Sequence, residues 1–218
     1  MRWLFDFLNS SIGKKITIGL AGLCLCGFLG PHLMGNLLLF AGPAQFNAYA
    51  RILTHNPLIP LAELGLLGLF LLHITVTLYA RWQNWQARPI GYENCVSKGG
   101  RTIGSRTMIY TAFFLLAFLV FHVATFKYGL GSGIDKEQLF ERVMEFFRQP
   151  LIAGFYILAM AALGLHLSHG CQSACQTLGI DHPKYTPGIK IAGALFAAAI
   201  AGAFAVIPIW ACFWGGAR

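Results

Sequence analysis

The chain has 218 residues, of which 56% are hydrophobic and only 11% are charged, and its mean hydropathy is +0.62. A soluble domain carries about a quarter charged residues, so this composition excludes an ordinary soluble protein. The formal net charge of +8 follows the predicted membrane topology described below, and it gives no reason to expect a nucleic-acid partner.

Five apolar segments are each long enough to cross a membrane, which takes about 20 helical residues. Lipid offers no partner for open backbone groups, so each segment is predicted to be a helix. The first is too long for a signal peptide and lacks a small-residue cleavage site. The sequence predicts an all-α integral membrane protein with one membrane domain over residues 1–218. Its predicted spans are residues 16–40, 61–82, 107–128, 151–178 and 189–214.

The segments around these spans have simple predicted roles. Residues 1–15 form an amphipathic lead with aromatic anchors. Span 16–40 repeats glycine at three- and four-residue spacings, which indicates close helix packing and leaves room for a flat macrocycle. Pro31 within it predicts a kink. Residues 41–60 are expected to be an outer loop, and 135–147 an amphipathic helix at the outer interface.

The basic residues are divided unequally between the two sides of the membrane. The N-terminal segment and the connections on its side hold ten of the sixteen basic residues and three of the eight acids. The opposite side holds six basic and five acidic residues. The positive-inside rule therefore places the N-terminus in the cytoplasm and the C-terminus outside.

The six cysteines do not form a disulfide framework, because most lie inside the apolar spans, where cysteine acts as a small apolar side chain. The chain has no Cys-x-x-Cys-His motif, so covalent attachment of a c-type haem is not expected.

Four histidines on four spans fall into two pairs at matching depths. His32 and His122 lie 16 and 15 residues from the inner ends of their predicted spans, about 23 Å at about 1.5 Å per residue. His73 and His169 each lie nine residues from theirs, about 13 Å. Burying a polar imidazole at membrane depth is costly, which favours a ligand over four unrelated structural histidines.

A haem iron with two axial imidazoles needs facing helices with one histidine each at one height. The two levels therefore predict two haems inside a four-helix bundle, with the fifth helix beside it. One tetrahedral zinc site is less favoured, because the histidines are split between the levels. His166 lies one turn from His169 and is the alternative ligand. The depth match and Gly170 favour His169, which leaves His166 to contact a backbone carbonyl, a propionate or a quinone.

Three segments carry a resemblance to a known family. FNAYARILTHNPLIPLAELGLL, SRTMIYTAFFLLAFLVFHVATFK and GLHLSHGCQSACQTLG are similar to the five-helix, dihaem cytochrome b subunit of succinate:quinone oxidoreductases, which include succinate dehydrogenase and quinol:fumarate reductase. The resemblance implies two b haems, with His73 and His169 holding the proximal haem iron and His32 and His122 the distal one.

The same resemblance implies the setting of the chain. It implies that the chain lies in a bacterial cytoplasmic membrane. It also implies that a flavoprotein subunit and an iron–sulfur subunit dock on the cytoplasmic face. FAD and iron–sulfur clusters belong to those partners, and the heterotrimers can pair as dimers. Electrons pass between succinate or fumarate and a quinone, commonly menaquinone, so this chain transfers electrons but has no dicarboxylate site of its own. The sequence does not decide the physiological direction.

Several further polar residues are candidates for the site. Glu63, near the outer end of its span, could accept a proton from quinol, although a helix N-terminal acid is equally expected after a proline. Some relatives carry a glutamate two residues before the last ligand, implicated in proton transfer, where this chain has Leu167. The candidate contacts to the proximal haem are Arg81, Ser105, Arg106 and Ser173. The positive-inside rule alone also explains the position of the two arginines.

Two other classes stay open at this stage. One is a b-type haem anchor of another respiratory enzyme, of the hydrogenase or formate dehydrogenase type, which the GLHLSHG segment fits poorly. The other is a haem-free scaffold or transporter. Transport is disfavoured because the mid-membrane positions are almost wholly apolar.

Overall fold

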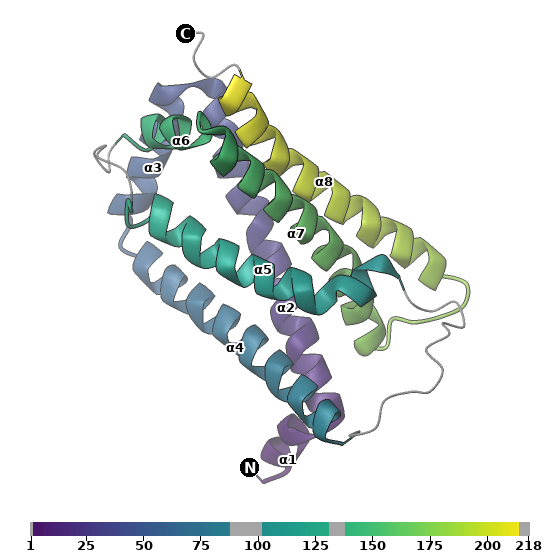
Figure 1. The fold of residues 1–218 in the computed structure, drawn as a ribbon. Helices are drawn as coiled ribbons and strands as arrows, with labels where there is room; N and C mark the ends of the chain where they lie inside the picture. The colour runs from purple at the N-terminus through teal and green to yellow at the C-terminus, as the bar shows by residue number, and fades with distance from the viewer. Residues whose placement is uncertain (1, 88–101, 131–137, 214–218) are drawn as a thin grey trace.

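The computed structural model describes residues 2–87, 102–130 and 138–213, and these form helices without any strand. Figure 1 shows the first helix, α1, at one end of the molecule and the end of α8 at the other. The predicted all-α membrane protein is confirmed, with every span within about five residues of its predicted bounds. The helices long and apolar enough to cross a membrane are α2 (Ser11–Leu37), α4 (Ile59–Gln86), α5 (Ile103–Phe126), α7 (Pro150–Thr177) and α8 (Thr186–Phe213).

The short helices differ in part from expectation. α1 (Arg2–Asn9) agrees with the amphipathic lead, and its Trp3 and Phe5 are exposed. The segment predicted as an outer loop instead contains η1 (Leu38–Ala41) and the α-helix α3 (Pro43–His55). Gly42, with φ at 100°, breaks the preceding span, and Pro43 then starts a new helix, because the first helical position needs no N–H donor.

The outer amphipathic helix is present as α6 (Leu139–Phe147), but most of it is buried within the protein. Arg142, Val143, Met144, Phe146 and Phe147 are all buried, so this helix packs against other helices more than it faces the interface. Residues 135–137 of the predicted segment lie outside the described residues.

Helix α7 is the centre of the packing. It contacts α8 most extensively, and it also packs against α5 and α2. Small residues allow this approach, since a Cβ at Gly164 would lie 3.2 Å from the Cβ of Ala201 on α8. Helix α8 therefore lies beside the α2–α4–α5–α7 group as the fifth helix (Figure 1).

Helix α4 packs differently from the other spans. It has extensive backbone contact with α2 and little with α5 or α7, and its most apolar stretch has no buried residue. At the end that carries α1, which the sequence predicts to be the inner end, Lys14 connects α2 to α4. Its Nζ donates to Oε1 of Gln83 and lies 5.1 Å from the ring centre of Tyr79. The face of α4 that does not meet α2 is thus not covered by protein among the described residues.

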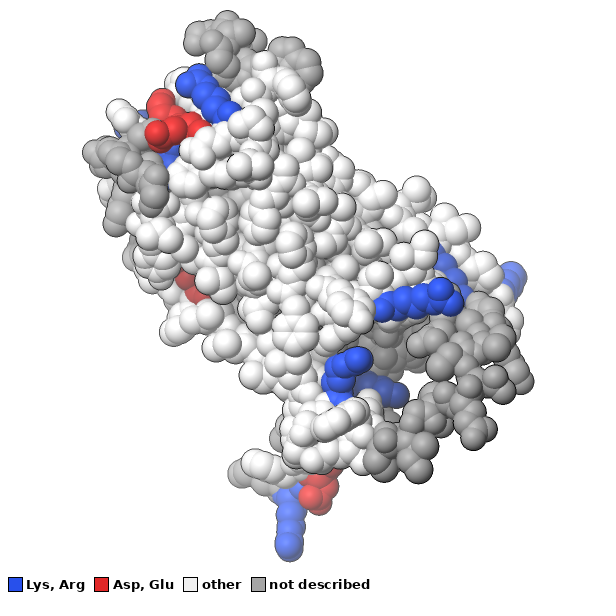
Figure 2. All heavy atoms as spheres, viewed as in Figure 1, with Lys and Arg blue, Asp and Glu red and all other residues white. Residues whose placement is uncertain are grey.

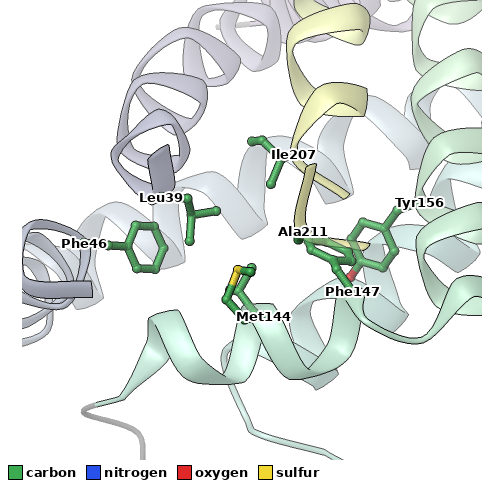
Figure 3. Close-up of a cluster of buried hydrophobic side chains, with 8 residues drawn as sticks. Leu39, Phe46, Met144, Phe147, Tyr156, Ile207 and Ala211 are labelled. Atoms are coloured by element: carbon green, nitrogen blue, oxygen red, sulfur yellow. The ribbon is translucent and has the colours of Figure 1, made fainter. Parts of the chain in front are cut away.

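A cap of apolar side chains closes the end of the bundle opposite α1, the predicted outer end. Its buried members come from η1, α3, α6, α7 and α8, and several are aromatic (Figure 3). Asn47 of α3 connects α3 to α6, because its side chain donates to Glu141 at 3.1 Å and accepts from the N–H of Phe140 at 2.9 Å. The buried members are Leu39, Phe46, Val143, Met144, Phe147, Tyr156, Ile207 and Ala211.

Charged side chains gather at the two ends of the molecule. Figure 2 shows blue and red atoms towards both ends and a broad uncharged band between them. A band without charge is what a hydrocarbon core requires. The distribution agrees with a protein that crosses the membrane several times.

Candidate functional site

The predicted ligand residues all lie inside the membrane-spanning helices. His32 is on α2, His73 on α4, His122 on α5, and His166 and His169 are on α7. Each is only partly exposed, although many apolar neighbours on the same helices are exposed. These imidazoles are therefore turned towards other helices, which is the first requirement for a shared ligand.

The structure brings His32 and His122 together near the outer end. Their ring centres lie 5.9 Å apart and their planes are at 87°. Two imidazoles bound to one metal ion by bonds of about 2 Å each place their ring centres roughly 6 Å apart. Phe28 stacks on His32 at 5.3 Å and Phe118 on His122 at 5.6 Å, so both rings lie among aromatic side chains.

His122 has a partner for its second ring nitrogen. Nδ1 lies 3.3 Å from the hydroxyl of Tyr156 on α7. The ring nitrogen of a metal-bound histidine that does not bind the metal usually has such a hydrogen bond, which fixes the ring orientation. When the Tyr156 oxygen accepts from Nδ1–H, Nε2 of His122 keeps its lone pair for a ligand.

His73 lies against α2. Its Nδ1 is 3.2 Å from the carbonyl oxygen of Ile18, and a Cβ at Gly22 would lie 3.1 Å from its Cε1. A carbonyl only accepts, so Nδ1 carries the proton and Nε2 keeps its lone pair. Gly22 thus provides the space in which the ring of His73 lies, and Ile18 holds the tautomer that can bind a metal.

His166 has a comparable arrangement. Its Nδ1 lies 3.3 Å from the hydroxyl of Thr111 on α5. That hydroxyl also lies 3.0 Å from the carbonyl of Met108 and 3.2 Å from that of Thr107, so its proton goes to a carbonyl of its own helix. The Thr111 oxygen then accepts from Nδ1–H of His166, and Nε2 is again free.

His169 lacks such a partner. Its Nδ1 is buried and makes no hydrogen bond within the described part of the chain. Its Cβ lies where Gly104 of α5 packs tightly against α7, because a Cβ at Gly104 would be 3.0 Å from it and 2.9 Å from the carbonyl oxygen of Leu165. A buried unpaired ring nitrogen is unfavourable for either tautomer.

The observed helix bounds also change the depth comparison. His73 lies 13 residues before the inner end of α4, His166 lies 11 before the inner end of α7, and His169 only eight. At about 1.5 Å per residue these depths are about 20, 17 and 12 Å. His166 is thus closer in depth to His73 than His169 is. The outer pair keeps similar depths, because His32 and His122 lie 21 and 19 residues after the starts of their helices.

Glu63 is paired in the structure. Its Oε2 forms an ion pair with Nζ of Lys127, which directly follows α5, and both side chains are nearly half exposed. This pair joins the outer ends of α4 and α5, two helices with little other contact. An exposed ion pair contributes little to the free energy of unfolding, so the main consequence of this pair is that it links the two helices.

The remaining candidates are less well placed. Arg81 is exposed near the inner end of α4, and Arg106 is exposed at the start of α5, with no hydrogen bond or ion pair between them among the described residues. The Ser105 hydroxyl is used locally, because it donates to the carbonyl of Thr102 at 2.8 Å. Ser173 is half-buried one turn beyond His169. Leu167 packs in an apolar cluster with Ala197 and Ile200 of α8.

The histidines present have the chemistry that a haem held between helices needs. One pair of imidazoles already has the separation that a shared metal needs. Three imidazoles direct Nδ1 to a partner on another helix, which leaves Nε2 for a ligand. Protein interiors are normally close-packed, yet one face of α4 has no protein packed against it within the described ranges, so a planar group can lie there.

Sequence reasoning missed the hydrogen-bond partners Tyr156, Thr111 and the carbonyl of Ile18. The signal for the first two was a hydroxyl inside an otherwise apolar span. Thr111 also lies 11 residues before His122, three helical turns away on the same face of α5. The carbonyl of Ile18 left no signal, because any residue supplies one.

The fold and the site define a multi-pass helical membrane protein with paired histidines in its interior. The family described as succinate dehydrogenase/fumarate reductase transmembrane subunit matches residues 94–207, and the chain belongs to this family. No curated protein and no solved structure gives a significant match. The match confirms the resemblance carried by the sequence, and it favours that assignment over a hydrogenase or formate dehydrogenase anchor and over a transporter.

Proposed function

We propose that this chain carries electrons across the membrane region between a quinone and the iron–sulfur subunit of a succinate dehydrogenase or fumarate reductase complex. The observation that carries the proposal is the close pair of His32 and His122 from α2 and α5. It is supported by the further histidines that α4 and α7 carry at a second depth. Family membership supports the association with the catalytic subunits of such a complex. Each b haem, when bound, supplies a one-electron couple between ferric and ferrous iron.

The distal haem is assigned to His32 and His122. Their ring separation supports the assignment, and Tyr156 holds His122 by its Nδ1. The rings of Phe28, Phe118 and Phe204 surround the two imidazoles, which keeps water away from the ligand nitrogens.

The proximal haem is assigned to His73 and to one histidine of α7. Two observations support His166 in place of His169, which the sequence favoured. His166 matches His73 better in depth, and Thr111 secures its Nδ1. His169 then lies beside the haem, and Arg81, Ser105, Arg106 and Ser173 stand only as candidate contacts at the inner end.

Quinol oxidation at the outer end is assigned to Glu63 as proton acceptor. The carboxylate is partly exposed near the outer end of α4, the end where His32 and His122 also lie. The ion pair with Lys127 holds the Glu63 carboxylate at this end of α4. Leu167, two residues before His169, lies in an apolar cluster and provides no proton acceptor. Menaquinone is the proposed quinone.

The proposed setting is a bacterial cytoplasmic membrane with the N-terminus inside. The excess of basic residues at the end that carries α1 supports this orientation. The flavoprotein and iron–sulfur subunits dock at that end with their FAD and clusters, and the heterotrimers can pair. The whole chain then acts as one membrane domain.

The test is a haem count with matched variants. The complex is purified in detergent, its haem is extracted, and the dithionite-reduced minus oxidised spectrum is recorded for wild type and for H32A, H73A, H122A, H166A and H169A. We expect two b haems per wild-type chain, loss of one in each of H32A, H73A, H122A and H166A, and retention of both in H169A.

Each other outcome has a defined meaning. A haem-free wild-type complex overturns the proposal. Loss in H169A with retention in H166A returns the proximal ligand to His169 and leaves the rest intact. One haem in the wild type shows that one of the two pairs is wrong.

A further inference from the structure

Tyr156 links the outer apolar cap to a proposed haem ligand. The residue lies on α7, is only 5% exposed and belongs to the buried cap cluster (Figure 3). Its ring contacts Phe118 and Phe147, each with ring centres 4.9 Å away, and its hydroxyl lies 3.3 Å from Nδ1 of His122. A phenol enclosed in this way has little freedom to rotate away from the imidazole.

The direction of this hydrogen bond follows from the role of His122. When Nε2 binds a metal, the neutral imidazole carries its proton on Nδ1. The Tyr156 oxygen must then accept from Nδ1–H. An imidazole that donates such a bond is a more electron-rich ligand. Electron donation by the ligand stabilises ferric more than ferrous iron, because the ferric ion carries the higher charge.

We infer that Tyr156 is a positioning residue that orients His122 through its hydroxyl and lowers the reduction potential of the distal haem. The inference rests on the proposed function, which assigns that haem to His32 and His122. It goes beyond that function because it gives the outer cap a role: packing within the cap fixes the position of the Tyr156 hydroxyl oxygen.

The proximal site has its own partners, which makes the effect separable. His73 donates to the carbonyl of Ile18 and His166 to the hydroxyl of Thr111, and neither contacts the cap. Removing the phenol hydroxyl should therefore alter one haem and leave the other unchanged.

The experiment is a potentiometric titration of the purified complex, followed by optical and electron paramagnetic resonance spectra. Tyr156→Phe removes the hydroxyl and keeps the ring that packs in the cap. Tyr49→Phe is the matched control, because it removes a hydroxyl near the same end that makes no hydrogen bond to a described residue. Thr111→Val is the reciprocal variant for the proximal site, with nearly the same side-chain volume.

We expect Y156F to keep two haems and to raise the distal potential. The reduced-to-oxidised ratio at fixed potential should rise up to about tenfold, which is about 59 mV for a one-electron couple. The distal resonance signal should change, and the proximal couple should not. T111V should move only the proximal couple, and Y49F should move neither.

Two results overturn the inference. If Y156F holds two haems and its distal couple and signal match those of Y49F, the hydroxyl has no positioning role. If Y156F lowers the melting temperature without moving the couple, Tyr156 is structural only. A wild-type complex without haem refutes the proposed function itself, and the inference falls with it, which distinguishes the two failures.

Discussion

Gly22 offers a direct test of how α2 holds the proximal ligand. A Cβ at this position would lie 3.1 Å from Cε1 and 3.5 Å from Nδ1 of His73. Carbon atoms pack best at about 3.5–4.0 Å, so Gly22→Ala should push the ring away from α2 by about 0.4 Å or more. Ile18 lies one turn from Gly22 on the same helix, so this movement also stretches the bond from Nδ1 to its carbonyl.

The magnitude follows from that bond. At 3.2 Å it is already at the long end of the range for N–H···O bonds. Its loss costs about 1 kcal/mol, and changes to a hydrogen-bond partner of a ligand typically lower metal affinity by about 10- to 100-fold. We expect G22A to weaken proximal haem binding by about tenfold.

The assay uses a background in which only the proximal haem remains. G22A is combined with H32A, and haem is titrated into the haem-depleted chain while the absorbance is followed. The matched control is Gly27→Ala in the same background, because a Cβ at Gly27 meets nothing within 4 Å. Both changes raise helix propensity by the same amount, about 1 kcal/mol. Equal affinities in G22A and G27A would refute the reasoning.

Three further variants test other contacts. Gly104→Ala should lower the stability of the complex by about 1–3 kcal/mol, because its Cβ would lie 2.9 Å from a backbone oxygen of α7. Thermal unfolding in detergent measures this loss, and Gly170→Ala, whose Cβ would meet nothing within 4 Å, is the control. Glu63→Gln should slow quinol oxidation by at least tenfold while leaving the haem content at the wild-type value, and an unchanged rate would remove Glu63 from the mechanism. Lys14→Met should loosen α4 by about 1 kcal/mol through loss of its bond to Gln83, seen as faster proteolysis at the inner end.

The spans could be predicted because lipid enforces helices of a minimum length and apolar composition. The same physics explains why α3 was missed. Outside the hydrocarbon core a polar segment can be loop or helix, and the Gly42–Pro43 pair ends one helix and starts another. The burial of α6 was missed for a related reason, because amphipathicity shows that one face is covered but not whether lipid or protein covers it.

The histidine pairs show where sequence reasoning about the site reaches its limit. His32 and His122 could be paired from depth alone, because both lie within about five residues of the outer ends of α2 and α5. The choice between His166 and His169 on α7 depended on where α4 and α7 end, and a shift of a few residues changes that choice. The actual end of α4 at Gln86, four residues beyond the predicted end, moves His73 deeper and favours His166.

A histidine metal site needs hydrogen-bond partners for Nδ1 as well as ligand nitrogens for the metal. A histidine can bind a metal through Nε2 only if Nδ1 carries the proton, and each described partner sets that condition differently. A backbone carbonyl at His73 accepts and cannot donate, so it fixes the tautomer at once. The Thr111 hydroxyl accepts from His166 because the carbonyls of its own helix take its proton. The Tyr156 phenol can do either, so at His122 the tautomer is set only when a metal binds. At the proposed distal site the outer cap and the bound group therefore decide the hydrogen bond together, and a change in cap packing should affect the proposed distal haem first.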